Sequence, residues 1–103
     1  GVMGDQRPKD MPQVPTLREL PGLSQFQVAS WNALAAPAKT PRAVIERLHT
    51  EVAGILQDAD MVQKLANLQV RAQASTPAQL GQLLDREIVR WREVIERAGI
   101  AAQ

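Results

Sequence analysis

The stretch TPAQLGQLLDREIVRWREVIERAG, residues 76–99, indicates that this chain is mainly helical. Thr76 is a favoured N-cap, Pro77 suits the first helical position, and Gln79 can reach back to complete a capping box. Gly99 stands where a left-handed residue commonly ends a helix. Between them runs an apolar stripe at spacings of three and four, made of Leu80, Leu84, Ile88, Trp91, Ile95 and Ala98. We expect one long amphipathic helix whose stripe lies in a core.

Two shorter helices are expected upstream of this one. Thr40 and Pro41 are a strong start signal, with Thr as the N-cap and Pro at the first helical position. The apolar stripe that follows comprises Val44, Ile45, Leu48, Val52, Ile55 and Leu56. Asp58 can cap a second helix, whose apolar positions are Met61, Val62, Leu65 and Leu68. These patterns predict three main helices between residues 38 and 103.

The region before the helices is predicted to be mostly extended or turning. Residues 1–25 hold several prolines, which disfavour regular helix. Thr16 and Glu19 have the spacing of a capping box, so a single helical turn is expected there, ending at Pro21 and Gly22.

Residues 26–37 are predicted to form a strand that Pro37 ends. The apolar positions alternate but change parity within it, from Phe26 and Val28 to Ala29, Trp31, Ala33 and Ala35. Such a change is typical of a bulge or of a strand that passes between two environments. Residues 69–74 also alternate and could form a short edge strand. The expected fold is therefore α/β and rich in helix.

The composition excludes several classes of protein. The chain has 103 residues, which fits one small domain. Its net charge is +1, its basic and acidic residues are interleaved, and it has only two Trp and one Phe, so nucleic-acid binding is not expected. Cysteine is absent, which leaves no disulfide and no thiolate ligand. The longest uncharged stretch, residues 20–38, is too polar to be a membrane span.

No catalytic or metal site is predicted. His49 is the single histidine, and its helical neighbours are apolar, so a flank position on an amphipathic helix is favoured over a metal ligand or a catalytic base. The carboxylates of the last helix alternate with arginines, which is typical of a solvated face. The sequence has neither a Gly-rich phosphate loop nor a serine elbow. We expect no enzyme activity and no cofactor.

Trp31 and Asn32 are the candidate ligand-binding residues. They lie where the parity of the predicted strand changes, and a Trp can bury its ring while its N–H reaches a polar partner. One interpretation places them in a cleft or hinge beside bound ligand. The other, which is favoured, makes Trp31 a core aromatic that packs on the following helices.

An ordered set of motifs along the chain carries a family resemblance. It comprises Arg7, MPQVPT at 11–16, Glu19, PG at 21–22, WNALAAP at 31–37, TP at 40–41, VIERL at 44–48, Asp58, Leu68, TP at 76–77, Glu87, Trp91, VI at 94–95 and AGI at 98–100. This set resembles that of the Bug-type (Bordetella uptake gene) solute-binding proteins of the tripartite tricarboxylate transporter family. One departure is Gln69, which stands where a Gly commonly follows the Leu.

The resemblance implies the carboxy-terminal part of a two-lobed periplasmic binding protein, a helix-rich fragment. Residues 1–25 would end the second lobe as a Pro-rich loop, 26–37 would be a crossover strand, and 38–103 would return as helices to the first lobe. Such a protein captures a small carboxylate or related solute in the periplasm and delivers it to membrane transporter subunits. Most solute contacts would come from the part outside these residues.

Two hypotheses about the chain therefore remain. The first is the solute-binding fragment, and the second is a stand-alone helical protein-interaction domain that has lost ligand binding. Residues 1–10 lack the apolar segment of a signal peptide, and the chain starts without an initiator Met, so we expect a piece of a longer protein. Helices without their sheet would expose apolar stripes, so we expect self-association or a small helical bundle.

Overall fold

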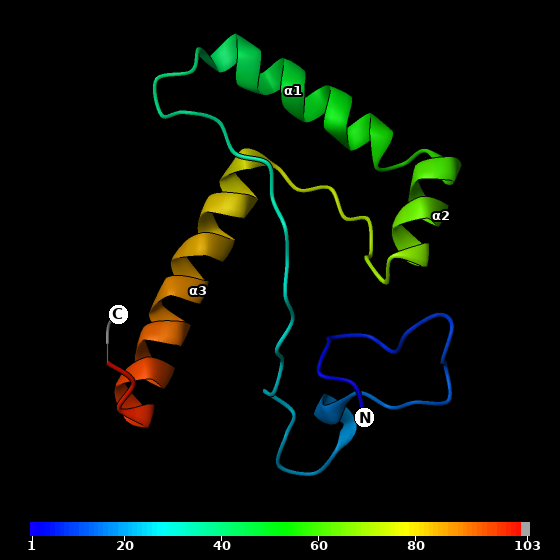
Figure 1. The fold of residues 1–103 in the computed structure, drawn as a ribbon, viewed down its shortest axis with the longest axis vertical. Coiled ribbons are helices and arrows are strands. Elements are labelled where there is room, and N and C mark those ends of the chain that lie inside the picture. The colour runs from blue at the N-terminus through cyan, green and yellow to red at the C-terminus, as the bar shows by residue number, and fades with distance from the viewer. Residues whose placement is uncertain (102–103) are drawn as a thin grey trace. The chain divides into compact units, whose positions relative to one another are not determined.

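A computed structural model describes residues 1–101, and residues 102 and 103, the end of the predicted helical segment 38–103, lie outside the described part. The described chain holds a short 3₁₀ helix and three α-helices (Figure 1), which are η1 (Leu17–Glu19), α1 (Arg42–Ile55), α2 (Ala59–Asn67) and α3 (Pro77–Ala98). The chain divides into two compact units, Gly1–Ala35 and Ala36–Gln103. The helix-rich character predicted from the sequence is confirmed.

The amino-terminal unit is a loop closed by backbone hydrogen bonds. Val2 makes an isolated parallel bridge with Thr16: the Val2 N–H donates to the Pro15 carbonyl at 3.0 Å, and the Leu17 N–H donates to the Val2 carbonyl at 2.8 Å. The Val28 N–H then donates to the Met3 carbonyl at 3.0 Å. Thr16 lies at the closure and is 3% exposed, the one buried residue of the described chain. Residues 1–28 are thereby tied into a closed loop.

The predicted turn at Thr16–Glu19 is confirmed as η1, but its capping box is wrong. The Thr16 side chain makes no cap hydrogen bond. The Glu19 carboxylate instead accepts a hydrogen bond from Arg7 at 2.9 Å. An ion pair with a distant arginine has displaced the local cap, and Gly22, with φ of 79°, turns the chain after the helix.

The caps of α2 and α3 are those that the sequence predicts. The Thr76 hydroxyl accepts from the Gln79 N–H at 3.1 Å, and the Gln79 side chain accepts from the Thr76 N–H at 2.9 Å, which completes the capping box. Asp58 accepts from the Met61 N–H at 3.1 Å at the start of α2. Both caps satisfy backbone donors that a helix start leaves free.

The predicted start of α1 is wrong by one residue. Pro41 occupies the N-cap, the helix begins at Arg42, and no side chain makes a cap hydrogen bond. The Pro41 carbonyl instead accepts the first helical N–H groups, those of Val44 at 3.0 Å and Ile45 at 3.2 Å. Pro41 has no backbone N–H that would need an acceptor, and the helix begins without a cap hydrogen bond from the Thr40 side chain.

Neither predicted strand is present in the described chain. Residues 26–37 and residues 69–74 have no strand assignment, and Figure 1 draws them without arrows. A strand requires a neighbour that accepts and donates ladder hydrogen bonds, and an alternating sequence cannot supply that neighbour by itself. The predictions of a crossover strand and an edge strand are therefore wrong for this structure.

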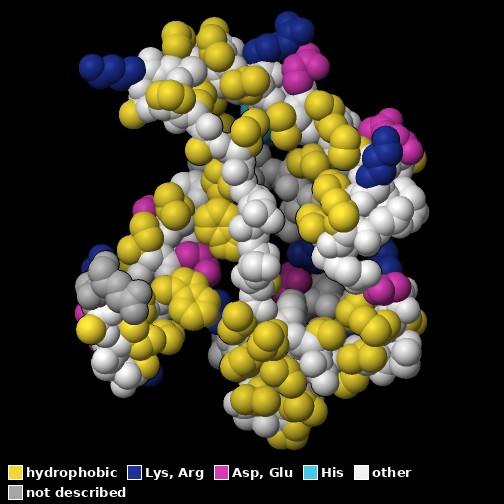
Figure 2. Space-filling view, viewed as in Figure 1, with side chains coloured by type: hydrophobic (Ala, Val, Ile, Leu, Met, Phe, Trp, Pro, Cys, Tyr) yellow, Lys and Arg dark blue, Asp and Glu magenta, His cyan; other side chains and the backbone are white. Residues whose placement is uncertain are grey.

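Apolar side chains are open to solvent along all three helices. No apolar side chain of residues 1–101 is buried, and the exposed fractions reach 72% at Leu68 and 67% at Leu34. Trp91, expected in a core, is 40% exposed. Figure 2 shows apolar side chains spread over the face in view. The three described helices of the second unit do not pack along one another, so of the two expected outcomes, self-association or a small bundle, the bundle is not present in the described chain.

No helix within residues 1–101 combines the length and the hydropathy that a span of a lipid bilayer requires.

The ends of α2 and α3 share one hydrogen-bond pattern with different residues at its centre. After α3, Gly99 has φ of 66° and the Ile100 N–H donates to the Ile95 carbonyl at 3.1 Å. After α2, Gln69 has φ of 59° and the Val70 N–H donates to the Leu65 carbonyl at 2.9 Å. This is the Schellman motif, which favours Gly at the left-handed position. Gln69 thus fills a position where a side chain is unfavourable.

Gln69→Gly should stabilise the end of α2, because a left-handed conformation costs a non-Gly residue about 1 kcal/mol. Amide hydrogen exchange followed by NMR should show the Val70 amide slowed roughly fivefold relative to the original chain. Gly99→Ala is the matched control and should speed exchange of the Ile100 amide. Equal exchange at Val70 in both chains would contradict this interpretation of Gln69.

Candidate functional site

An ion pair between Arg7 and Glu19 is the main side-chain contact of the amino-terminal unit. The Arg7 Nε donates to Glu19 Oε1 at 2.9 Å, and Nη2 donates to the second carboxylate oxygen, so the pair is bidentate. The remaining Nη1 donates to the Pro12 carbonyl at 3.1 Å. Thr16 adds a long contact, in which its hydroxyl lies 3.5 Å from Glu19 Oε1. One guanidinium thereby holds the Pro-rich segment and η1 together.

The pair shifts the acid–base behaviour of both groups. Hydrogen bonds from Arg7 hold the pKa of the Glu19 carboxyl below its usual range. The hydrogen bond to Glu19, followed by its negative charge, raises the pKa of the Arg7 guanidinium. Both side chains remain exposed to water, at 47% and 39%. The charge of Arg7 is therefore already matched by that of Glu19.

The predicted ligand residues lie beyond this ion pair. Trp31 and Asn32 come after Val28, whose N–H bond to the Met3 carbonyl is the last backbone hydrogen bond that closes the loop of residues 1–28. Both are exposed, and Trp31 retains 41% of its accessible surface. The structure thus leaves the Trp31 ring open to a partner, and a role in solute binding stays a prediction for both residues.

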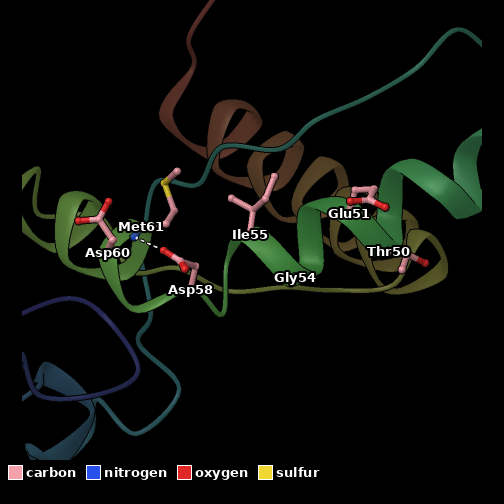
Figure 3. A pocket seen from close by; sticks show the side chains of 7 residues that line it. All are labelled: Thr50, Glu51, Gly54, Ile55, Asp58, Asp60 and Met61. Carbon is pink, nitrogen blue, oxygen red and sulfur yellow. Dashed lines mark hydrogen bonds between the residues drawn. The ribbon is translucent and has the colours of Figure 1, made fainter.

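A shallow hollow lies where α1 meets α2 (Figure 3), lined by Thr50, Glu51, Gly54, Ile55, Asp58, Asp60 and Met61. Its three carboxylates already have partners. Glu51 pairs with Arg47 at 2.9 Å, Asp60 pairs with a lysine of α2 at 2.8 Å, and Asp58 caps α2 through the Met61 N–H. The hollow therefore offers no free charge cluster for a cation or a polar ligand.

Other residues considered as ligands are not brought together. His49 is half-buried on α1, and the described residues contain no group of three His, Cys, Asp or Glu side chains that could hold a metal ion. On α3, the Trp91 indole N–H donates to Glu87 at 2.8 Å, and the Arg90 guanidinium lies 5.6 Å from the ring centre. These contacts hold the orientation of an exposed ring.

Sequence reasoning missed the Arg7–Glu19 pair as a contact, although it found both residues as motif positions. The available signal was a lone arginine before a Pro-rich stretch and a glutamate in the turn that follows it. Pairing across twelve residues depends on how the loop closes, and single-residue patterns do not encode that closure.

Comparison with known proteins shows where the chain belongs among them. Residues 1–100 match the model of a family described as the tripartite tricarboxylate transporter family receptor. The UPF0065 protein in the tcbD-tcbE intergenic region of a Pseudomonas sp. is 36% identical over 95 residues, which are 92% of this chain and 28% of that protein. The UPF0065 protein in the TAR-I ttuE-ttuC' intergenic region of Agrobacterium vitis is 36% identical over 92 residues, 86% of this chain and 26% of that protein.

This chain covers a larger share of a third relative. The UPF0065 protein in the clcB-clcD intergenic region of Pseudomonas knackmussii is 30% identical over 95 residues, 92% of this chain and 56% of that protein. The chain therefore spans about a quarter of the length of the first two relatives and about half of the third. No solved structure matches the chain significantly.

The closed loop of residues 1–28 should open in acid. Because the pKa of Glu19 is lower in the folded loop than in an open chain, its stabilising contribution is present above the open-chain pKa of about 4.3. That contribution is lost as the pH falls through the lowered value. NMR at pH 6 to 3 should show faster exchange of the Val2 and Val28 amides, after correction for intrinsic rates, together with broadening of the Arg7 Nε–H signal.

Glu19→Gln should remove this pH dependence and leave the loop open already at pH 6. Glu46→Gln breaks an exposed Arg–Glu pair on α1 and serves as the matched control, with no effect on residues 1–28. If the Val28 amide exchanged at the same corrected rate across the whole pH range in the original chain, the ion pair would not close the loop.

Proposed function

This chain belongs to the tripartite tricarboxylate transporter receptor family, and we propose that it forms the carboxy-terminal scaffold of an extracytoplasmic solute-binding receptor. The observation that carries the proposal is the match of residues 1–100 to the family, which takes in the loop, the exposed segment and all three helices. The resemblance seen in the motifs of the sequence is thereby confirmed. The family is one of transporter solute receptors and not of enzymes.

The proposed solute is a small carboxylate or a related anion, bound in the periplasm and passed to membrane subunits of the transporter. Carboxylates are held by matched donors such as guanidinium groups and backbone N–H groups. Arg7 is occupied by Glu19, and Arg42 and Arg47 pair with glutamates of α1. We therefore assign most solute contacts to the rest of the receptor, with Trp31 and Asn32 as the contribution of this chain.

The open apolar stripes favour one alternative, a stand-alone helical domain that binds another protein. The two functions differ in what precedes Gly1 in the gene. A signal peptide and a first lobe encoded upstream would support the receptor, and a start codon close to Val2 and Met3 would support the interaction domain.

Solute binding can be tested on the full-length receptor that carries this segment. Small carboxylates at about 100 times their Kd should stabilise it by about 2.7 kcal/mol and raise its Tm by several degrees. Trp31→Ala and Asn32→Ala should each reduce this ligand-induced rise. Trp91→Ala on α3 is the control, expected to change the Tm without solute and to keep the rise. A full-length receptor that shows no rise with any of a panel of carboxylates would refute the proposed solute class.

The 103-residue chain alone should self-associate, because its apolar side chains lack cover. Sedimentation velocity over a hundredfold range of concentration should show a sedimentation coefficient that rises with concentration. Added salt should strengthen the association, as expected for apolar contacts rather than ion pairs. A single monomeric boundary at every concentration would count against it.

A further inference from the structure

Glu87 departs from the solvated position that the sequence predicts for the carboxylates of α3. A helix brings residues three, four and seven positions apart onto one face. By this spacing the face around Glu87 is apolar and consists of Leu80, Leu83, Leu84, Trp91 and Val94. The Glu87 side chain is 19% exposed, whereas the other acidic residues of α3 are exposed. A carboxylate therefore interrupts the apolar face of the helix.

The two oxygens of the Glu87 carboxylate have different surroundings. Oε2 accepts the Trp91 indole N–H at 2.8 Å. Oε1 lies 3.6 Å from Arg90 Nη1, which is close enough for an ion pair but longer than a hydrogen bond. The charge of the carboxylate is thus matched on its own helix, while a carboxylate can accept about four hydrogen bonds. Within residues 1–101, Oε1 therefore keeps room for one more donor.

Covering the apolar face of α3 would make it costly to leave Oε1 without a hydrogen bond. The chain spans 28% and 26% of its two 36%-identical relatives, so most of such a receptor lies outside it and can supply the cover. Burial removes water from Oε1, and a buried polar atom without a partner destabilises a protein. Buried polar atoms are accordingly almost always hydrogen-bonded. Because Arg90 already matches the charge, an uncharged N–H or O–H donor is sufficient.

We propose that Glu87 bridges α3 and the rest of the receptor, with Oε2 bonded to Trp91 and Oε1 accepting an uncharged N–H or O–H donor from outside this chain. The proposal rests on the proposed function in one respect, that the rest of a receptor covers α3. A buried polar group has one favourable register, whereas a purely apolar stripe tolerates several. Glu87 is thus a positioning residue that fixes where α3 lies along the surface that covers it.

A cation or a second copy of the chain is a poorer source of this donor. A second cation at the Glu87 carboxylate would be buried without an anion of its own, which is unfavourable. A second copy that packs its α3 on this face brings no uncharged hydroxyl, because α3 contains no Ser, Thr or Tyr. The backbone N–H groups of that helix are bonded internally beyond its first turn.

Glu87→Gln tests the proposal, because Gln has one acceptor oxygen where Glu has two. In the full-length receptor that carries this segment, one of the two donors then loses its acceptor. The unfolding equilibrium constant should rise roughly tenfold to a hundredfold, as measured by urea unfolding followed by far-UV circular dichroism. Glu93→Gln, at an exposed position of α3, is the matched control and should change the constant by less than about threefold.

The 103-residue chain alone should tolerate the same substitution. Its Trp91 indole N–H can donate to the carbonyl of the new amide in place of the carboxylate. Glu87→Gln should therefore leave the helix content and the sedimentation behaviour of this chain unchanged. Weaker self-association of the variant would identify a second copy as the source of the donor and overturn the proposal.

Trp91→Phe removes the indole donor and provides the decisive background. With one donor left, one acceptor is enough, so Glu87→Gln should now change the unfolding constant of the receptor by less than about threefold. An equal loss in both backgrounds would show that the charge matters, and no loss in either would show that Glu87 serves Trp91 alone. Both results would overturn the proposal.

Failure of the single variant to fold does not leave the question open. A receptor with Glu87→Gln that does not fold, beside a double variant with Trp91→Phe that does, supports the proposal. If neither variant folds, a second acceptor oxygen is not what the receptor needs, and the proposal is refuted.

Solute-dependent melting of the same receptors separates this inference from the proposed function. A loss from Glu87→Gln that Trp91→Phe removes, in a receptor without any response to carboxylates, would refute the solute class and support the contact at Glu87. A carboxylate response with no loss from Glu87→Gln would refute the contact and leave the proposed function standing.

Discussion

The constraint on which this structure depends is the lack of an internal partner for its apolar surface. Apolar residues make up 45% of the chain, yet no apolar side chain of residues 1–101 is buried. The hydrophobic effect, the largest favourable contribution to most folds, therefore contributes less within the described chain than it does in a packed domain. What remains are local interactions, namely helix caps, ion pairs within a helix and the closed loop around Thr16.

This constraint explains which parts of the fold could be predicted from the sequence. Helices with their own caps are encoded within a few residues, so the ends of α3 at Thr76 and Gly99 were predicted correctly. The start of α1 was missed by one residue because Pro41 serves where Thr40 was expected. The prediction of strands over 26–37 and 69–74 was wrong for a different reason. Alternation of apolar residues favours a strand, but a strand forms only beside a neighbouring strand that exchanges backbone hydrogen bonds with it.

The candidate site shows the same division between local and distant information. Family motifs located Arg7 and Glu19, but their bidentate pairing follows from closure of the loop over twelve residues. Trp31 and Asn32 were proposed from a change of parity in a segment that is exposed in the structure, and their role in solute binding remains a prediction. We propose that the chain is a scaffold whose local structure is already formed and whose apolar surfaces are covered by the rest of the receptor.

Differential scanning calorimetry of the dilute 103-residue chain tests this view most directly. A packed domain of this length absorbs heat in one cooperative transition with a heat-capacity change of about 1.2–1.5 kcal/mol/K. We predict a broad transition with less than about half of that heat-capacity change, because little apolar surface is buried. A sharp transition with the full change, from a chain shown to be monomeric, would mean that the chain has a core of its own and would contradict the scaffold interpretation.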